Sequence, residues 1–341
     1  MYELIIAAFV LLSLILYALL GGADFGGGMW DLLACGPRAE QQRKAIAAAI
    51  SPIWEANHVW LILVIVLLFS AFPPAFAALM TALHIPITLM LTGIVLRGSA
   101  FIFRKYDSQG VGVRHRWGAV FGAACFFTPF FQGMVMGALT TGQIRCVDGQ
   151  VTTGFFAGWL TPFAFACGVF APVLFTFLAA TYMTLYTRAE PALQNDFRRR
   201  ALGSGLALGP VALAVFLTSK TGAPEMFHGL TQWWAPLLLT GTSLCAGTAL
   251  LALWRRWFVL ARIAAAAQVA LILAGWGCAQ YPNLITPDVT LHNSAAPEAT
   301  LRLLTFALSA GAVLLLPALI FLFRLFSHPD NDRDAPPKSE P

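Results

Sequence analysis

Two carboxylates lie in stretches that are otherwise almost entirely apolar: Asp24 in GGADFGGGMW at positions 21–30, and Glu55 in SPIWEANHVWL at positions 51–61. A charged carboxylate in hydrocarbon is costly unless it is neutralised, paired or hydrated, so an acid in a membrane segment is a functional-site hypothesis by default. Positioned carboxyl groups are suited to taking up and releasing protons. Asp24 and Glu55 therefore predict proton handling inside a bilayer.

The residues around these acids could assist proton exchange. Asn57 and His58 follow Glu55 within one helical turn, and His58, three positions on, shares a helix face with it. The alternative for Glu55 is a simple helix-terminal acid, because the positive end of the helix dipole favours a carboxylate there. The glycines around Asp24 permit close packing of helix backbones or a water-filled gap beside the acid. Glu55, Asp24, His58 and Asn57 form the candidate proton pathway.

Other polar residues in the apolar stretches indicate no cofactor site. Arg97 lies well inside a predicted span, where it could pair with an acid, contact a lipid head group or extend its side chain to the interface. His58 and His84 are the histidines within spans, and a lone intramembrane histidine is more often hydrogen-bonded than a haem ligand. The six cysteines show no metal-ligand spacing. We predict that this chain itself ligates no haem and no metal.

The composition is typical of a polytopic membrane protein, since 58% of the 341 residues are hydrophobic and only 11% are charged. A bilayer core of roughly 30 Å needs about 20 helical residues for each crossing. Hydropathy on this basis predicts nine transmembrane helices, at 3–30, 54–73, 76–103, 116–140, 155–186, 201–218, 233–253, 259–279 and 301–325. We predict an all-α fold in which residues 1–326 form a single integral membrane domain.

The basic residues predict the orientation, because short loops that carry Lys and Arg stay on the cytoplasmic side. Seventeen basic residues fall in one set of alternating loops and the tail, and three, Arg145, Lys220 and Arg302, fall in the other set. This bias predicts a periplasmic N-terminus and a cytoplasmic C-terminus. The net charge of +5 is thus a topology signal and indicates no nucleic-acid role. Residues 327–341, rich in Pro and charge, are expected to form a disordered cytoplasmic tail.

Four strings occur in order along the chain: GGADFGGGM at 21–29, SPIWEANHVWL at 51–61, LRGSAFIFR at 96–104, and YPNLI at 281–285 with LHNSAA at 291–296. Together they resemble the signatures of subunit II of the cytochrome bd-type quinol oxidases. The resemblance covers essentially the whole chain. It implies a fold of two four-helix bundles plus one peripheral helix, in a multi-pass protein of the bacterial cytoplasmic (inner) membrane.

The resemblance also implies partners and chemistry. The family's complex oxidises ubiquinol or menaquinol, reduces dioxygen to water and takes up protons from the cytoplasm. Haems b558, b595 and d, or a b-type variant, are expected in the partner subunit I, and none in subunit II. A small single-helix accessory subunit and membrane lipid are further expected partners.

The resemblance implies roles for individual residues as well. The Trp54-Glu55 pair matches a family position commonly written Trp-Asp, whose acid belongs to a proton route, so Glu55 is one methylene longer than usual. Asp24 matches an acid near the same cytoplasmic entrance. Independently of the resemblance, we expect Asp24→Asn to be milder than Glu55→Gln if water can bypass Asp24. Trp60 matches an aromatic near a proposed oxygen route, and Trp54 and Trp60 are candidates for oxygen access or the subunit interface.

Two other functions remain open at this point. A purely structural assembly subunit would have the same spans, and neutral isosteres of Asp24 and Glu55 should leave it active. A secondary transporter would also carry intramembrane acids, but it should show two internal repeats with interrupted helices in matching positions. We find no such repeat in the sequence, and its acids cluster toward one side of the predicted membrane domain.

Overall fold

The computed structural model describes residues 1–51, 54–106 and 111–326 of the chain. Within these residues, nine helices are long and apolar enough to cross a membrane, which confirms the prediction of nine spans. The expected tail, residues 327–341, lies outside the described residues.

Helices of the first half are α1 (Tyr2–Leu32), α2 (Ala39–Ile50), α3 (Trp54–Ala71), α4 (Pro73–Ala82), α5 (His84–Tyr106) and α6 (Val111–Ala138). Helices of the second half are α7 (Pro162–Tyr186), α8 (Pro191–Gly222), α9 (Pro224–Gly229), α10 (Ala235–Arg255), α11 (Phe258–Gln280) and α12 (Glu298–Phe326). Two small antiparallel hairpins lie in loops, β1 (Cys146–Val147) with β2 (Gln150–Val151), and β3 (Asn283–Ile285) with β4 (Val289–Thr290).

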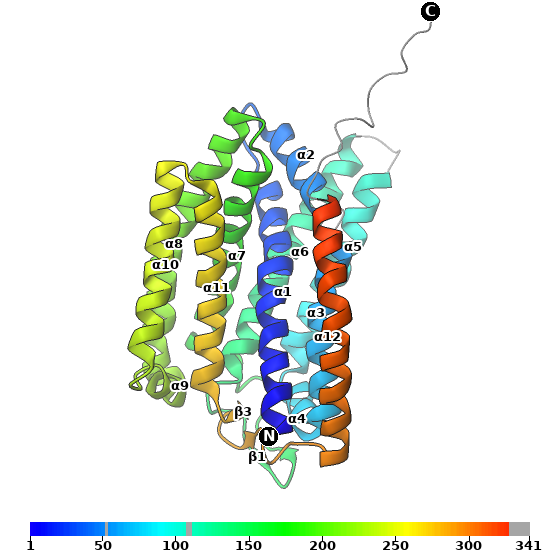
Figure 1. The fold of residues 1–341 in the computed structure, drawn as a ribbon, viewed down its shortest axis with the longest axis vertical. Coiled ribbons are helices and arrows are strands. Elements are labelled where there is room, and N and C mark those ends of the chain that lie inside the picture. The colour runs from blue at the N-terminus through cyan, green and yellow to red at the C-terminus, as the bar shows by residue number, and fades with distance from the viewer. Residues whose placement is uncertain (52–53, 107–110, 327–341) are drawn as a thin grey trace, which may run out of the picture.

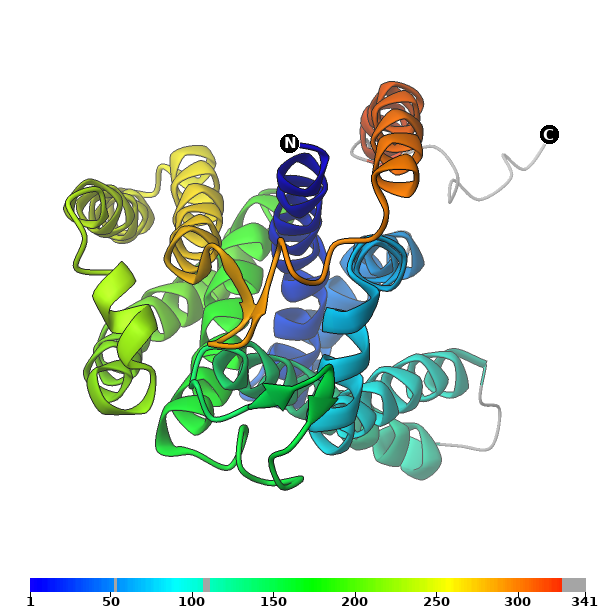
Figure 2. The same cartoon turned by 90° about the horizontal axis from the view of Figure 1, so that it is seen from below.

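Contacts divide the nine long helices of the described residues into two groups of four with one helix beside them, an arrangement that can be followed in Figure 2. Helices α1, α3, α5 and α6 make the first group, and α7, α8, α10 and α11 make the second, with α1 packed against α6, α7 and α11 at the centre. Helix α12 packs mainly against α1 and, less extensively, against α3. Its apolar side chains, such as Leu303 and Phe306, are exposed. It is the peripheral helix.

Glycines allow α1 to lie this close to its neighbours. A Cβ atom on Gly26 would overlap the backbone carbonyl of Phe175 in α7, and one on Gly28 would overlap the sulfur of Cys125 in α6. Of the two roles considered for these glycines, close packing of helix backbones is therefore the one observed. This packing brings Asp24, on the same stretch of α1, into the protein interior.

Some predicted boundaries were wrong. The third span, expected at 76–103, is divided at Leu83 into the short α4 and the long α5. Helices α7 and α8 begin at Pro162 and Pro191, because proline suits the first turn of a helix, where its missing N–H group is not needed. Thr161 also caps α7 by accepting a hydrogen bond from the Ala164 amide at 3.1 Å. The amphipathic α2, which has only 12 residues, was not predicted.

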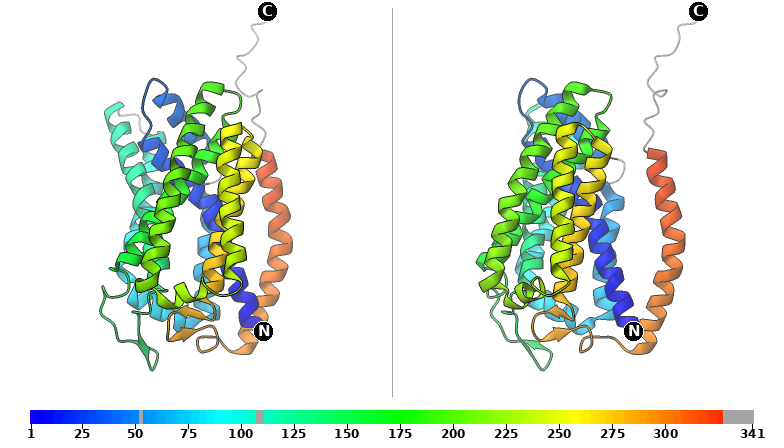
Figure 3. Two further views of the ribbon diagram at one scale, coloured as in Figure 1. Left: turned by 90° about the vertical axis from the view of Figure 1, so that its left-hand side faces the viewer. Right: turned by 60° about the vertical axis from the view of Figure 1, so that its left-hand side comes forward.

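The bundle has two distinct ends (Figures 1 and 3). One end carries α2, the start of α8 and the end of α10, and we name it the α2 end. The other carries the N-terminus, α9 and both hairpins, and we name it the hairpin end. The loops that are rich in Lys and Arg all lie at the α2 end, whereas Arg145, Lys220 and Arg302 lie at the hairpin end.

Candidate functional site: a buried charged cluster

A charged cluster lies among α1, α3 and α5, away from the hairpin end. Asp24 comes from α1, Asn57 and His58 from α3, and Arg97 from α5. The exposed fractions of Arg97, Asp24 and Asn57 are 2%, 5% and 1%. An ionised pair at this depth is stable only if its hydrogen-bonding groups find partners, so these contacts decide what the site can do.

The four side chains form a connected set. Asn57 Nδ2 donates a hydrogen bond of 2.5 Å to Asp24 Oδ2, and Arg97 Nη2 lies 3.9 Å from the same oxygen. Arg97 Nη1 lies 3.0 Å from His58 Nε2. Because an arginine can only donate, His58 Nε2 must accept, which leaves the ring neutral with its proton on Nδ1. His58 is therefore a neutral ring whose Nε2 accepts a hydrogen bond from the Arg97 cation.

Aromatic rings enclose this cluster. The Arg97 guanidinium lies 4.6 Å from the ring centroid of Phe25 and 5.9 Å from that of Phe121, distances at which a cation is attracted to a ring face. The ring of Tyr17, two turns before Asp24 on α1, lies 6.0 Å from that of His58. The rings separate the charges from hydrocarbon and place a phenol next to the histidine.

Several polar atoms of the cluster have no hydrogen-bond partner among the described residues. They are Tyr17 Oη, Asn57 Oδ1, His58 Nδ1, Arg97 Nε and Arg97 Nη2. Buried polar atoms in proteins are usually paired, and where protein groups do not pair them an internal water does so. Five such atoms around one carboxylate make the cluster a suitable place for a short chain of water.

The structure leaves Glu55 outside the cluster. Glu55 lies in the first turn of α3, as expected, and its side chain is exposed. Among the described residues, no hydrogen bond or ion pair joins it to His58 or to Asp24. The expected set of four is thus divided into an interior part, Asp24, Asn57 and His58, and one acid at the surface.

The remaining predicted residues have clear structural positions. Arg97 pairs with Asp24, so of the three possibilities considered for it, pairing with an acid is the one observed. Trp60 is 7% exposed and belongs to the apolar core. Trp54 is half-buried, with its ring 5.8 Å from that of Phe101. His84 is held by its ring nitrogen Nδ1, 2.9 Å from the carbonyl of Thr81.

Two further ionic contacts at the α2 end were missed by sequence reasoning. Asp31, the last residue but one of α1, accepts two hydrogen bonds from Arg104, at 2.6 and 3.1 Å. Asp196 accepts two from Arg38, both at 2.7 Å. Asp31 lies in the same apolar helix as Asp24, so the criterion that selected Asp24 could have found it.

Asp31 and Arg104 also border a largely apolar pocket of about 300 Å³ beneath α2.

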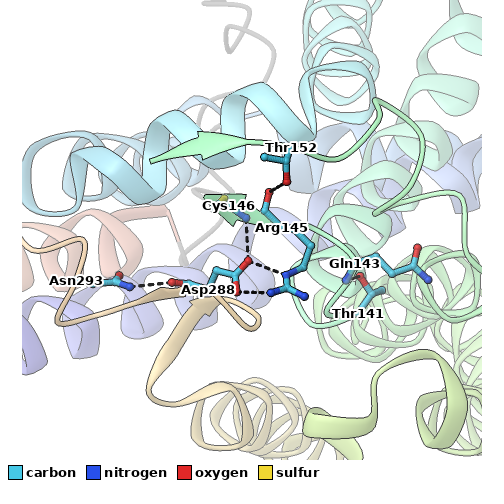
Figure 4. Close-up of polar contacts among 7 residues, drawn as sticks. All are labelled: Thr141, Gln143, Arg145, Cys146, Thr152, Asp288 and Asn293. Carbon is cyan, nitrogen blue, oxygen red and sulfur yellow. Dashed lines mark hydrogen bonds and ion pairs between the residues drawn. The ribbon is translucent and has the colours of Figure 1, made fainter. Parts of the chain in front are cut away.

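A second polar set joins two loops at the hairpin end (Figure 4). Arg145 donates from Nε and Nη2 to the two oxygens of Asp288, at 2.8 and 3.1 Å, and the Cys146 amide donates to Asp288 Oδ2 at 2.8 Å. Asn293 Nδ2 donates to the Asp288 carbonyl. These contacts hold the loop before α12 against the loop before α7, and we name them the loop latch.

The ion pair between Arg145 and Asp288 in the loop latch should stay intact at physiological pH. The hydrogen bonds from Arg145, and then that from the Cys146 amide, lower the pKa of Asp288 below its ordinary value. A carboxyl with a lowered pKa stabilises the fold above its unfolded pKa of about 4, and that contribution is lost only as the pH falls through the lower folded pKa. We expect Asp288→Asn and Arg145→Gln each to open the loops, by up to about tenfold in the opening equilibrium.

The rate at which a maleimide labels Cys146, measured at fixed pH with the other cysteines replaced, checks this expectation. Asp288 also raises the pKa of the Cys146 thiol, after the larger effect of burial, so Asp288→Asn could speed labelling by that route alone. Arg145→Gln keeps the acid and is the matched control. Faster labelling in Asp288→Asn but not in Arg145→Gln would contradict loop opening.

Within the described residues, no group of three or more His, Cys, Asp or Glu side chains lies close enough to hold a metal ion. The fold and the cluster thus define a class of protein: a helical, integral membrane subunit that keeps an ion pair and a neutral histidine inside the bilayer. The particular family is given by a sequence profile. The chain belongs to the cytochrome bd terminal oxidase subunit II family, whose profile matches residues 2–326.

Individual proteins agree with this assignment. A putative cytochrome bd menaquinol oxidase subunit II of Bacillus subtilis is 25% identical over 323 residues, which is 91% of each chain. The cytochrome bd-I ubiquinol oxidase subunit 2 of Escherichia coli is 30% identical over 186 residues, 53% of this chain and 48% of that protein. The fold matches a chain in a structure of the bd oxidase from Geobacillus thermodenitrificans with a TM-score of 0.81 and 23% identity, over 95% of this chain and 98% of that one.

The family resemblance drawn from the four sequence strings is therefore confirmed. The chain is a subunit of a cytochrome bd quinol oxidase, which is an oxidoreductase complex, and it is a multi-span membrane protein. Membership of that complex implies a subunit I as partner and a quinol as the substrate of the complex.

Proposed function

We propose that this chain supports the haem-bearing subunit I and carries protons toward it from the cytoplasm during the reduction of dioxygen to water. The observation that carries the proposal is the buried cluster of Asp24, Asn57, His58 and Arg97, which lies among helices that otherwise present apolar residues. A scaffold needs no ion pair at this position, and burying one costs free energy that apolar packing would not.

Glu55 is the proposed inlet of the route. It is exposed at the start of α3, and Asp24 and Asn57 lie buried beyond it. His58, on the same helix, can accept or pass a proton through Nδ1, and the unpaired polar atoms around Asp24 provide sites for connecting water. Tyr17 lies two turns before Asp24 on α1, on the side of the hairpin end, so its hydroxyl is the proposed inner end of the route.

The haems are proposed to lie in subunit I. Relatives differ in the quinol in their names, menaquinol in Bacillus subtilis and ubiquinol in Escherichia coli, so either is a candidate substrate here. A small accessory subunit and bound lipid remain proposed partners, and the bacterial inner membrane is the proposed location. Trp60 is proposed to contribute to oxygen access only through the packing of the core around α3.

A tag on this chain should purify a complex with haem absorption bands of b and d type, whereas the chain expressed without its partner should show none. The physical reason is that neither spanning histidine has an arrangement suited to an axial ligand: His58 faces Arg97, and the ring of His84 lies 5.0 Å from that of Phe155. Visible spectra of both preparations provide the measurement. Stoichiometric haem in the isolated chain, lost in His58→Ala or His84→Ala, would show that the assignment is wrong.

The orientation gives a second expectation. A reporter fused at Asp148 should be periplasmic, because Asp148 and Gly149 form the turn of the β1–β2 hairpin at the end with few basic residues. A reporter after Arg333, which lies outside the described residues, should be cytoplasmic. A cytoplasmic signal from Asp148 in the intact protein would contradict the proposed orientation and with it the cytoplasmic inlet.

Oxygen consumption by fully assembled complexes tests the proton role against the scaffold alternative. Neutral variants at Glu55 and Asp24 should lower the turnover of each assembled complex, normalised to its haem content. Wild-type turnover in both variants would favour a purely structural subunit.

A further inference from the structure

Several basic side chains at the α2 end are engaged by their own chain. Arg38 pairs with Asp196, Arg104 with Asp31, and Lys44 with Glu40. Arg43 and Arg200 donate hydrogen bonds to backbone carbonyls near the end of α1. The remaining positive charge is therefore not spread evenly over this end of the bundle.

Four arginines gather where α8 begins and α10 ends. We name them the basic corner: Arg198, Arg199, Arg255 and Arg256. Within the part of the chain that the structure describes, none of them forms an ion pair with an acid. Arg199 follows Arg198 on α8, and the hydrogen bonds of Arg198 to the Leu253 and Trp254 carbonyls bring the end of α10, with Arg255 and Arg256, beside it. Like charges held together at an exposed surface favour the binding of an anion.

The backbone holds this arrangement in place. Arg198 donates from Nε to the Leu253 carbonyl at 2.6 Å and from Nη2 to the Trp254 carbonyl at 3.0 Å, so it ties α8 to the end of α10. Arg256 follows α10 with a φ of 63°, a left-handed conformation that residues with side chains rarely adopt. Arg198 thus acts within the protein, and Arg199, Arg255 and Arg256 are exposed beside it.

The surface next to the basic corner has the character of a membrane interface. Trp254 and Trp257 are 72% and 55% exposed, and Trp233, at the opposite end of α10, is 90% exposed. Tryptophans prefer the level of the lipid head groups, so they mark the two faces of the bilayer along α10. Between these levels α8 and α10, at the outer edge of the bundle, expose leucines, among them Leu206, Leu213, Leu244 and Leu251 (Figure 1).

We propose that the basic corner binds the phosphate of an anionic phospholipid, whose acyl chains lie along the exposed leucines of α8 and α10. Guanidinium groups donate paired hydrogen bonds to phosphate oxygens, and basic clusters between helices at the head-group level recognise anionic lipid. An anionic phospholipid matches both features of this surface: its phosphate would contact the arginines, and its acyl chains would contact the leucines exposed between the two levels of tryptophan. The proposed orientation places this lipid in the cytoplasmic leaflet.

The test compares two variants of the purified oxidase complex that remove equal charge from the α2 end. Arg255→Gln/Arg256→Asn removes two arginines of the basic corner, and asparagine tolerates the left-handed conformation at position 256. Lys44→Gln/Arg116→Gln removes two basic residues elsewhere at the same end. The measurement is the rise in Tm as phosphatidylglycerol is added, with phosphatidylcholine and inorganic phosphate as separate arms, and with haem spectra to confirm assembly.

Each arginine near an anionic head group contributes about fivefold in binding, so the basic-corner variant should need about 25-fold more phosphatidylglycerol for half of the Tm rise. The control variant should respond like the wild type, and Arg199→Gln, on the exposed helix surface, should show about a fivefold effect even if the double variant assembles poorly. An unchanged response in the basic-corner variants overturns the proposal. So does an equal loss in the control, or equal stabilisation by phosphatidylcholine or by inorganic phosphate.

Discussion

Replacing Glu55 by Gln is expected to slow oxygen consumption by the assembled oxidase by roughly ten- to thousand-fold, the range for loss of a positioned proton-transfer group. Glutamine keeps the volume and part of the hydrogen bonding of the side chain but has no proton to exchange. Because Glu55 is exposed and makes no ion pair among the described residues, the substitution should leave folding and assembly intact. The loss should therefore appear in turnover alone.

Two variants control this experiment. Glu55→Asp keeps a titratable carboxyl on a side chain one methylene shorter, so it should retain most activity. Glu40→Gln removes another exposed acid from the same end of the bundle, one that only pairs with Lys44 on α2, and should be harmless. Normal turnover of Glu55→Gln with a full haem complement would mean that Glu55 is only a helix-terminal carboxylate.

Replacing Asp24 by Asn is expected to reduce the amount of assembled complex as well as its turnover. From the sequence this variant was expected to be milder than Glu55→Gln, but the structure shows Asp24 as the counter-charge of the buried Arg97. Removing one member of a buried ion pair leaves the other charge unpaired, which typically costs about 3 to 5 kcal/mol. The yield of haem-containing complex, measured from its spectrum, should fall accordingly.

The double variant Asp24→Asn/Arg97→Gln separates the two roles of Asp24. It removes both charges, so assembly should recover toward the wild-type yield, whereas turnover should stay low if Asp24 relays protons. Recovery of both quantities would identify Asp24 as a structural partner of Arg97 and would remove it from the proposed route. Failure of assembly to recover would show that the ion pair itself is not what the complex requires.

Much of the fold could be read from the sequence, because lipid leaves few choices. Every backbone polar group in hydrocarbon must be satisfied within the chain, so each long apolar stretch has to be a helix. Some helix boundaries follow prolines more closely than hydropathy: α7 and α8 begin at Pro162 and Pro191, whereas hydropathy predicted that these spans begin at 155 and 201. The amphipathic α2 escaped prediction because its polar residues resemble those of a loop.

The site was read only in part. Asp24, Asn57, His58 and Arg97 could each be selected by residue type, since polar groups in a bilayer are costly and rare. The sequence did not predict which of these side chains contact one another, because spacing along one helix shows only which residues of that helix lie close together. Spacing grouped Glu55 with His58, whereas the packing of three helices groups His58 with Arg97 and Asn57 with Asp24.

The sequence by itself determined the class of protein, the number of spans, the family and the residues with the chemistry for proton exchange, because these depend on composition and on local motifs. Only the tertiary structure decided that Arg97 neutralises Asp24, that Glu55 stays at the surface, and that arginines from the start of α8 and the end of α10 share one corner. Those facts depend on how α1, α3 and α5, and separately α8 and α10, approach one another. The glycines of α1 permit its own close approach, but the direction in which each helix packs is set by all the side chains together.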